Sequence, residues 1–143
     1  MMTPADLFVE GASGNRLHLA DWGGEGTGLL LLHGMGAHTG WWDAAAPLLA
    51  PGRRVLALDM RGHGESAWLE PPRYSIEDYA ADIDAVRRAM GWERFALAAH
   101  SLGARVALRY ASQAPERLEA AAFLDFLAEA RPGSHERYQR RAK

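Results

Sequence analysis

The sequence has no cysteine, no long apolar run and little net charge, and each absence narrows the classes of protein it can encode. Without cysteine there can be no disulfides or thiolate metal sites, and a reducing cytoplasm fits this composition. No apolar stretch approaches the roughly 20 residues of a membrane span, and the N-terminus lacks the features of a signal peptide. A formal net charge of -2 gives no reason to expect nucleic acid or an anionic membrane surface as a partner. We therefore expect a cytoplasmic protein that binds neither.

The composition is that of one globular domain. The chain has 143 residues, of which 48% are hydrophobic and 24% are charged. A domain of about this size buries roughly two thirds of the surface that its unfolded chain exposes. The chain is therefore long enough to form a sizeable core.

The order of apolar segments predicts an α/β fold. Residues 7–10 and 16–22 flank a Gly/Ser/Asn cluster and predict an antiparallel hairpin. Four later apolar runs predict buried strands, at residues 28–33, 54–59, 94–100 and 118–125. Helices are predicted between them, at a Trp/Ala/Leu-rich segment after the first run, at residues 75–91 and at residues 102–113. This alternation indicates a mostly parallel sheet that follows an antiparallel hairpin and is covered on both faces.

Ser101 lies where a predicted strand runs directly into a predicted helix. Such a turn lifts its central residue above the sheet and crowds the residues two positions away, so small residues are needed there. Here they are Ala99 and Gly103, giving A-x-S-x-G where the usual pattern is G-x-S-x-G. The turn also places the amide of Leu102 at a helix N-terminus, which favours negative charge. The pattern predicts a nucleophile, although a serine here could also be an ordinary helix N-cap.

Two glycine-rich stretches follow the two preceding strands. The stretch HGMGAHTGWW, residues 33–42, lets the backbone turn sharply and by its position would aim the amide of Met35 at a developing oxyanion. The stretch DMRGHGES, residues 59–66, contains Asp59 and Arg61, which we expect to hold their loop by hydrogen bonds.

These three stretches, in this order and at these strand ends, resemble the α/β-hydrolase superfamily. The resemblance extends from the N-terminal hairpin to Asp125. It implies that Ser101 is the nucleophile and that the backbone amides of Met35 and Leu102 form the oxyanion hole. It implies no cofactor and no metal.

The resemblance also implies a substrate pocket. His33 and Gly34 look like the family's HG pair that precedes the oxyanion loop, and with Trp41 and His100 we expect them to line the pocket. Each has a simpler interpretation: the histidines could shape turns, and Trp41 could anchor a helix on the sheet.

The rest of the catalytic triad is not evident in the sequence. In this superfamily an acid and then a histidine follow the nucleophile in the chain. Asp125 is a candidate acid, and the only downstream histidine, His135, is a weak candidate base. We therefore expect the amino-terminal half of the fold, ending after its sixth strand, with residues 1–127 as core and residues 128–143 as the start of a lid or a polar tail. The exposed edge of that strand would favour self-association or binding of a complementing C-terminal half.

The function implied is a serine hydrolase that cleaves a small-molecule ester or related acyl substrate through an acyl-enzyme on Ser101. Carbon–carbon bond hydrolysis and cofactor-free perhydrolysis would use the same residues. Serine at this position, where the epoxide-hydrolase and dehalogenase branches would have aspartate, argues against those branches. A non-catalytic hydrolase-like fragment or binding module is the alternative from another class.

Overall fold

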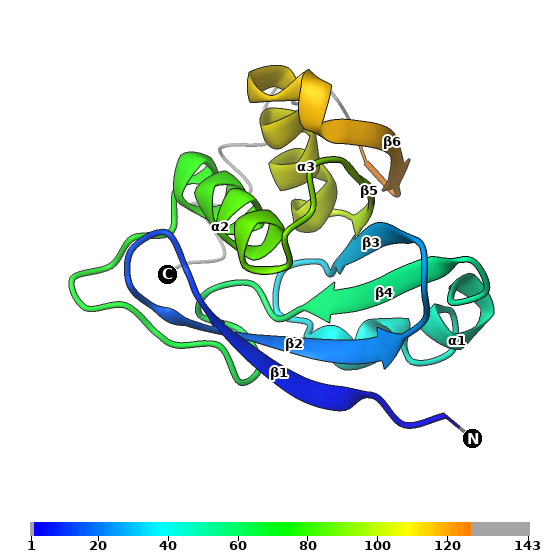
Figure 1. Cartoon of the computed structure of the whole chain (residues 1–143). Helices are drawn as coiled ribbons and strands as arrows, with labels where there is room; N and C mark the ends of the chain where they lie inside the picture. Colours follow the sequence, from blue (N-terminus) through cyan, green and yellow to red (C-terminus); the bar gives the residue numbers. More distant parts are fainter. Residues whose placement is uncertain (1, 127–143) are drawn as a thin grey trace.

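A six-stranded mixed sheet forms the centre of the computed structural model, which describes residues 2–126 (Figure 1). Its strands are β1 (Ala5–Glu10), β2 (Arg16–Gly23), β3 (Thr27–Leu32), β4 (Arg53–Leu58), β5 (Phe95–His100) and β6 (Leu118–Leu124). The order across the sheet is β1-β2-β4-β3-β5-β6. β1 and β2 form the predicted antiparallel hairpin, and β2 is antiparallel to β4. The neighbouring strands β4, β3, β5 and β6 are parallel to one another. The predicted fold class is confirmed. The segment 128–143 lies outside the described residues.

Helices cover both faces of this sheet. They are η1 (Thr39–Trp42), α1 (Ala46–Leu49), α2 (Ile76–Ala89), α3 (Leu102–Gln113) and η2 (Pro115–Arg117). On one face α2 and α3 pack against alternate strand residues such as Leu30 and Leu56. On the other face η1 and α1 cover the intervening residues, such as Leu31 and Val55. The alternation of side chains along each strand thus divides the core into two layers.

Helix α2 begins and ends where the sequence predicts. The Ser75 side chain accepts from the backbone N–H of Asp78, and the Asp78 carboxylate accepts from the N–H of Ser75, which forms a capping box. Gly91 follows the helix with φ of 68°, a left-handed conformation that ends helices.

The single helix expected between β3 and β4 is instead two four-residue pieces, η1 and α1. Pro47 lies in the first turn of α1. Proline has no N–H to donate and its ring clashes with the carbonyl four residues earlier, so a helix that began before Ala46 could not continue through it.

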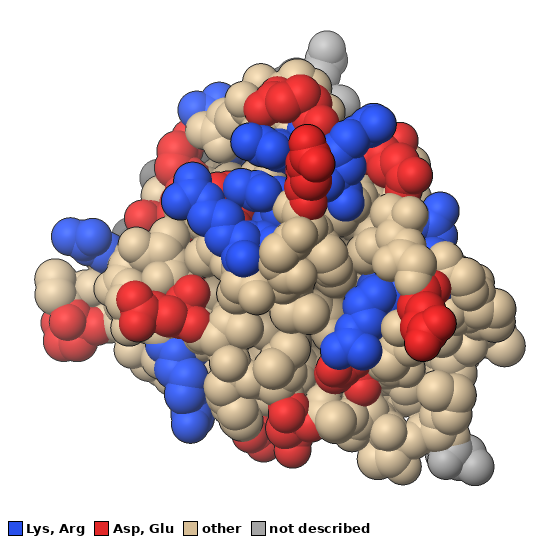
Figure 2. Space-filling model, viewed as in Figure 1, with Lys and Arg blue, Asp and Glu red and all other residues tan. Residues whose placement is uncertain are grey.

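Strand β6 is the edge of the sheet in the described part of the chain, and most of its residues are exposed. Phe123 and Leu124 are 40% and 44% exposed. Over the face shown in Figure 2, acidic and basic side chains are interspersed with uncharged ones. Within residues 2–126 there is no helix with the length and apolar character needed to span a membrane.

Candidate active site

Ser101 adopts a strained backbone conformation at the junction of β5 and α3. Its φ is 52° and its ψ is -112°, a region that residues other than glycine rarely occupy. Its N–H donates to the carbonyl of Leu124 in β6 at 3.1 Å. The Ser101 side chain makes no capping hydrogen bond with α3. It is therefore not an ordinary N-cap, because an N-cap serine has extended backbone angles and uses its hydroxyl to accept from the first turn.

Two glycines allow the chain to pack closely around Ser101. A methyl group at Gly103 would lie 2.6 Å from the carbonyl oxygen of His33 and 2.8 Å from Cβ of Leu32. A methyl group at Gly34 would lie 3.3 Å from Cβ of Ser101. The loop after β3 and the start of α3 are thus in direct contact with the turn that carries Ser101. Ala99, the departure from the family pattern, is fully buried in β5, so its methyl group is accommodated.

The two amides expected to form an oxyanion hole lie in this neighbourhood. Met35 directly follows Gly34 in a tight turn, in which the N–H of Ala37 donates to the carbonyl of Gly34 at 3.1 Å. Leu102 is the first residue of α3. In the described residues neither amide donates to another group. Both remain available to a ligand oxygen, and the N-terminus of α3 adds a favourable dipole.

His100, Trp41 and Asp125 come together on the other side of the turn. The His100 and Trp41 rings are stacked, with centroids 4.7 Å apart and an interplanar angle of 18°. The His100 Nε2 atom lies 3.6 Å from Oδ2 of Asp125. Asp125 follows β6 with φ of 49°, and its side chain is 89% exposed. A methyl group at Gly34 would lie 2.9 Å from Nδ1 of His100, so this cluster also borders the loop after β3.

His33 is not in a substrate pocket, which corrects the expectation from the sequence. It is fully buried. The hydrogen on Nδ1 is donated to the carbonyl of Gly34 at 2.7 Å, and Nε2 accepts from the N–H of Met60 at 3.0 Å. Burial lowers the pKa of His33 to about 4, so the ring is neutral at pH 7. The ring therefore ties the loop after β3 to the loop after β4.

No histidine in residues 2–126 is hydrogen-bonded to Ser101. His63 bonds through Nδ1 to the carbonyl of Arg61 at 3.1 Å, and Nδ1 of His38 accepts from the N–H of Gly40 at 3.1 Å. The weak candidate base His135 lies outside the described residues.

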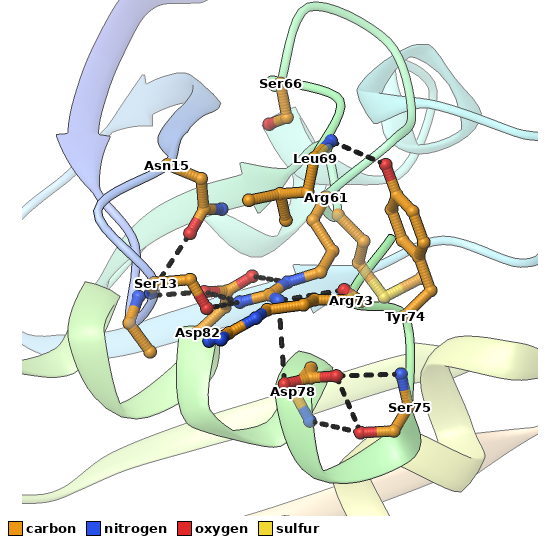
Figure 3. Close-up of polar contacts among 12 residues, drawn as sticks. Ser13, Asn15, Arg61, Ser66, Leu69, Arg73, Tyr74, Ser75, Asp78 and Asp82 are labelled. Atoms are coloured by element: carbon orange, nitrogen blue, oxygen red, sulfur yellow. Dashed lines mark hydrogen bonds and ion pairs between the residues drawn. The ribbon is translucent and has the colours of Figure 1, made fainter. Parts of the chain in front are cut away.

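Arg61 holds its loop as the sequence predicted (Figure 3). Its guanidinium is fully buried and binds both carboxylate oxygens of Asp82 in α2, at 2.6 and 2.7 Å. It also donates to the carbonyl of Arg73 at 2.9 Å and, at 3.4 Å, to the hydroxyl of Ser13 in the hairpin turn. The loop after β4 is thereby fixed to α2 and to the hairpin.

Asp59 joins the two glycine-rich loops. Its Oδ1 atom accepts from the N–H of Thr39 at 2.7 Å, and its Oδ2 atom accepts from the N–H of Glu65 at 2.9 Å. The sequence-based reasoning missed the partner of this carboxylate, His18 in β2, whose Nδ1 lies 2.8 Å from Oδ2. The available signal was a histidine between two leucines of a predicted strand.

Comparison with known proteins agrees with this geometry. A family model described as alpha/beta hydrolase fold matches residues 28–143, and the chain belongs to this family. The six-stranded sheet with its N-terminal hairpin is the N-terminal portion of that fold.

Relatives within the family carry different activities in their names. The chain is 37% identical over 109 residues to a fluoroacetate dehalogenase from a Burkholderia species, covering 73% of this chain and 36% of that protein. It is 34% identical over 122 residues to an N-formylmaleamate deformylase from Pseudomonas putida, covering 82% and 46%. A solved alpha/beta hydrolase from Novosphingobium aromaticivorans superimposes with a TM-score of 0.87 at 30% identity, covering 97% of this chain and 50% of that one. The chain thus spans between about a third and a half of the length of these proteins.

Proposed function

We propose that this chain carries the nucleophile and the oxyanion hole of a serine hydrolase that cleaves an ester or related acyl compound. The Ser101 hydroxyl attacks the substrate carbonyl, the amides of Met35 and Leu102 stabilise the tetrahedral oxyanion, and water then releases the acid from the acyl-enzyme. The observation that carries this proposal is the state of Ser101. It holds a backbone conformation that costs free energy, yet its hydroxyl caps nothing.

The names of the relatives bear on the choice of reaction. A deformylase removes a formyl group, which is the smallest acyl group, so that name agrees with acyl transfer to water. The dehalogenase name belongs to a branch that the resemblance associates with aspartate as nucleophile, whereas this chain has Ser101. We therefore place the substrate among acyl compounds rather than among alkyl halides or epoxides.

The general base is proposed to come from outside the 143-residue chain, either from a complementing C-terminal half or from a second copy of the chain. Asp125 is the proposed acid in this arrangement. It lies at the carboxyl end of β6 beside His100, and its exposed carboxylate is open to a base that arrives from outside.

Labelling with a fluorophosphonate tests the nucleophile. We expect modification of Ser101, detected by peptide mass spectrometry, at a rate at least about tenfold above that of Ser112, because an oxyanion hole and binding can together leave ~10³-fold acceleration over water when a triad member is missing. Ser112 is a matched comparison: it is an exposed serine of α3, and its hydroxyl donates to the carbonyl of Arg109. Ser101→Ala removes the labelling and Ser112→Ala leaves it. Equal reactivity of the two serines in a folded sample would refute the proposal and favour a non-catalytic module.

Added imidazole tests the missing base. A small external base can enter an exposed site and accept the proton of Ser101, so we expect labelling and turnover of a short aryl ester to rise with imidazole concentration. Ser101→Ala should not respond. A base contributed by a second copy would instead make the labelling rate rise with protein concentration. If labelling were fast without imidazole in dilute protein, the base would lie within the chain itself, and this part of the proposal would be wrong.

A further inference from the structure

A buried histidine lies between two carboxylates on the hairpin side of the sheet. The Nδ1 atom of His18 is 2.8 Å from Oδ2 of Asp59, and its Nε2 atom is 2.9 Å from Oδ1 of Asp6 in β1. The side chains of His18 and Asp59 are 6% and 2% exposed, whereas that of Asp6 is 75% exposed. In residues 2–126 no group of three or more acidic or histidine side chains is arranged to hold a metal ion, so this is not a metal site.

The hydrogen-bond donors around Asp59 occupy both of its carboxylate oxygens. Three groups face the two carboxylate oxygens of Asp59: the N–H of Thr39, the N–H of Glu65 and the ring of His18. An acceptor-only carboxyl group is an ionised one. Both ring nitrogens of His18 face carboxylates, and a ring with hydrogen on both nitrogens, an imidazolium, would donate to each of them.

The surroundings of His18 support the same charge. The hydrogen bonds and charges of Asp59 and Asp6 outweigh the effect of burial, which by itself would lower the pKa, so the pKa of His18 is raised. The neutral ring of Phe8 in β1 also packs against the His18 ring, with centroids 5.1 Å apart, and the hydroxyl of Ser66 accepts from the backbone N–H of His18. Arg16 on the same strand has its guanidinium over the Phe8 ring, 4.5 Å from its centroid.

This arrangement connects β2 to the oxyanion loop. Asp59 anchors Thr39, the first residue of η1, and η1 directly follows the loop that contains Met35. The same carboxylate anchors Glu65 in the loop after β4. A buried carboxylate that lost this hydrogen-bond donor would draw in water to replace it, and that change weakens its bonds to the two backbone amides.

We propose that His18 is a positioning residue: through its hydrogen bond to Asp59 it fixes the oxyanion loop beside Ser101. Its role is distinct from that of a general base, because both of its ring nitrogens are occupied and neither bonds to Ser101. The part of this inference that concerns catalysis rests on the proposed serine-hydrolase function. The part that concerns the loop does not.

Two substitutions at residue 18 separate the two contacts of the ring. In His18→Asn the amide nitrogen takes the place of Nδ1 and can still donate to Asp59. In His18→Gln it takes the place of Nε2 and reaches only toward Asp6. Asp6→Asn is the control for the exposed contact, which contributes little because water screens it.

Amide hydrogen exchange of the full 143-residue chain tests the loop directly. We expect His18→Gln to speed exchange at Thr39 and Glu65 by about tenfold or more, because a hydrogen bond to a charged group is lost at their common acceptor. His18→Asn and Asp6→Asn should leave both amides within about threefold of the parent. Equal exchange in the Gln and Asn variants would mean that His18 only fills space, and would overturn the proposal.

Labelling of Ser101 by fluorophosphonate tests the catalytic part on the same proteins. The rate should fall about tenfold in His18→Gln and recover in His18→Asn. If the parent does not label at all while the exchange pattern holds, the proposed function fails and the loop positioning stands. If the parent labels and His18→Gln labels equally fast, the catalytic part of this inference is wrong.

The charge of the ring gives a test that needs no variant to fold. Nitrogen chemical shifts of His18 in the parent protein should show both ring nitrogens protonated at pH 7. A ring without hydrogen on Nδ1 would overturn the proposal, because it could not donate to Asp59.

Discussion

Replacing Gly103 by alanine should destabilise the protein even though alanine is the better helix former. In an exposed helix the change would gain about 1 kcal/mol. Here the new methyl group would lie 2.6 Å from the carbonyl oxygen of His33, 2.8 Å from Cβ of Leu32 and 2.9 Å from the carbonyl oxygen of Leu32. All three contacts are closer than real Cβ atoms allow, and two of them are with backbone atoms that no side-chain rotation can relieve.

The overlap therefore belongs at the upper end of the overpacking range, about 3 kcal/mol. Subtracting the gain in helix propensity leaves a net loss of about 2 kcal/mol in the free energy of unfolding. For a domain of this size that corresponds to a fall of roughly 6 °C in Tm.

Urea and thermal unfolding, followed by circular dichroism, measure this loss. Ser112→Ala is the matched control, since it lies in the same helix with an exposed side chain and should change stability by less than about 0.5 kcal/mol. A Gly103→Ala protein as stable as the parent, or more so, would show that α3 can move away from β3. The close approach that we assign to the turn at Ser101 would then not hold.

Two further outcomes follow from buried polar groups. Asp82→Ala should lower the free energy of unfolding by about 3–5 kcal/mol, because it leaves the buried Arg61 cation without its carboxylate. The control Glu77→Ala breaks an exposed pair with Arg109 and should change the free energy of unfolding by less than about 1 kcal/mol. Similar losses for the two variants in urea unfolding would contradict this assignment. The pKa of His33 is lowered to about 4 in the folded protein, so the contribution of this neutral ring to stability is complete above pH 6.5. As the pH falls from 6.5 to 4, the free energy of unfolding should decrease by about 3 kcal/mol, because the unfolded chain binds the proton more tightly than the folded one. Urea unfolding over that pH range, with His33→Gln for comparison, checks the slope, which the variant should lack.

The regular elements could be predicted from the sequence because their signals are local. Helix α3 matches the predicted range of residues 102–113, and α2 begins at the predicted capping box. The segment after β3 could not be predicted as well. Its alanines and tryptophans favour a helix, but Pro47 divides it into short pieces.

The candidate site could be predicted only in part, for a related reason. The position of Ser101 follows from the strand-to-helix junction, which the sequence contains. The direction of a ring does not follow from its place in the chain: His33 turns inward to Gly34 and Met60, whereas His100 stacks on Trp41. The ion pair of His18 and Asp59 joins residues 41 positions apart, and only the folded sheet brings them together.

The left-handed backbone at Ser101 gives stability and reactivity opposite requirements at one position, because the residue that would relax the backbone carries no hydroxyl. Glycine adopts such angles without strain, so Ser101→Gly would relax the turn while deleting the hydroxyl. A laboratory selection that rewarded resistance to heat alone would enrich this variant and in doing so discard the proposed nucleophile. Stabilised versions of the protein should therefore be sought with residue 101 held constant.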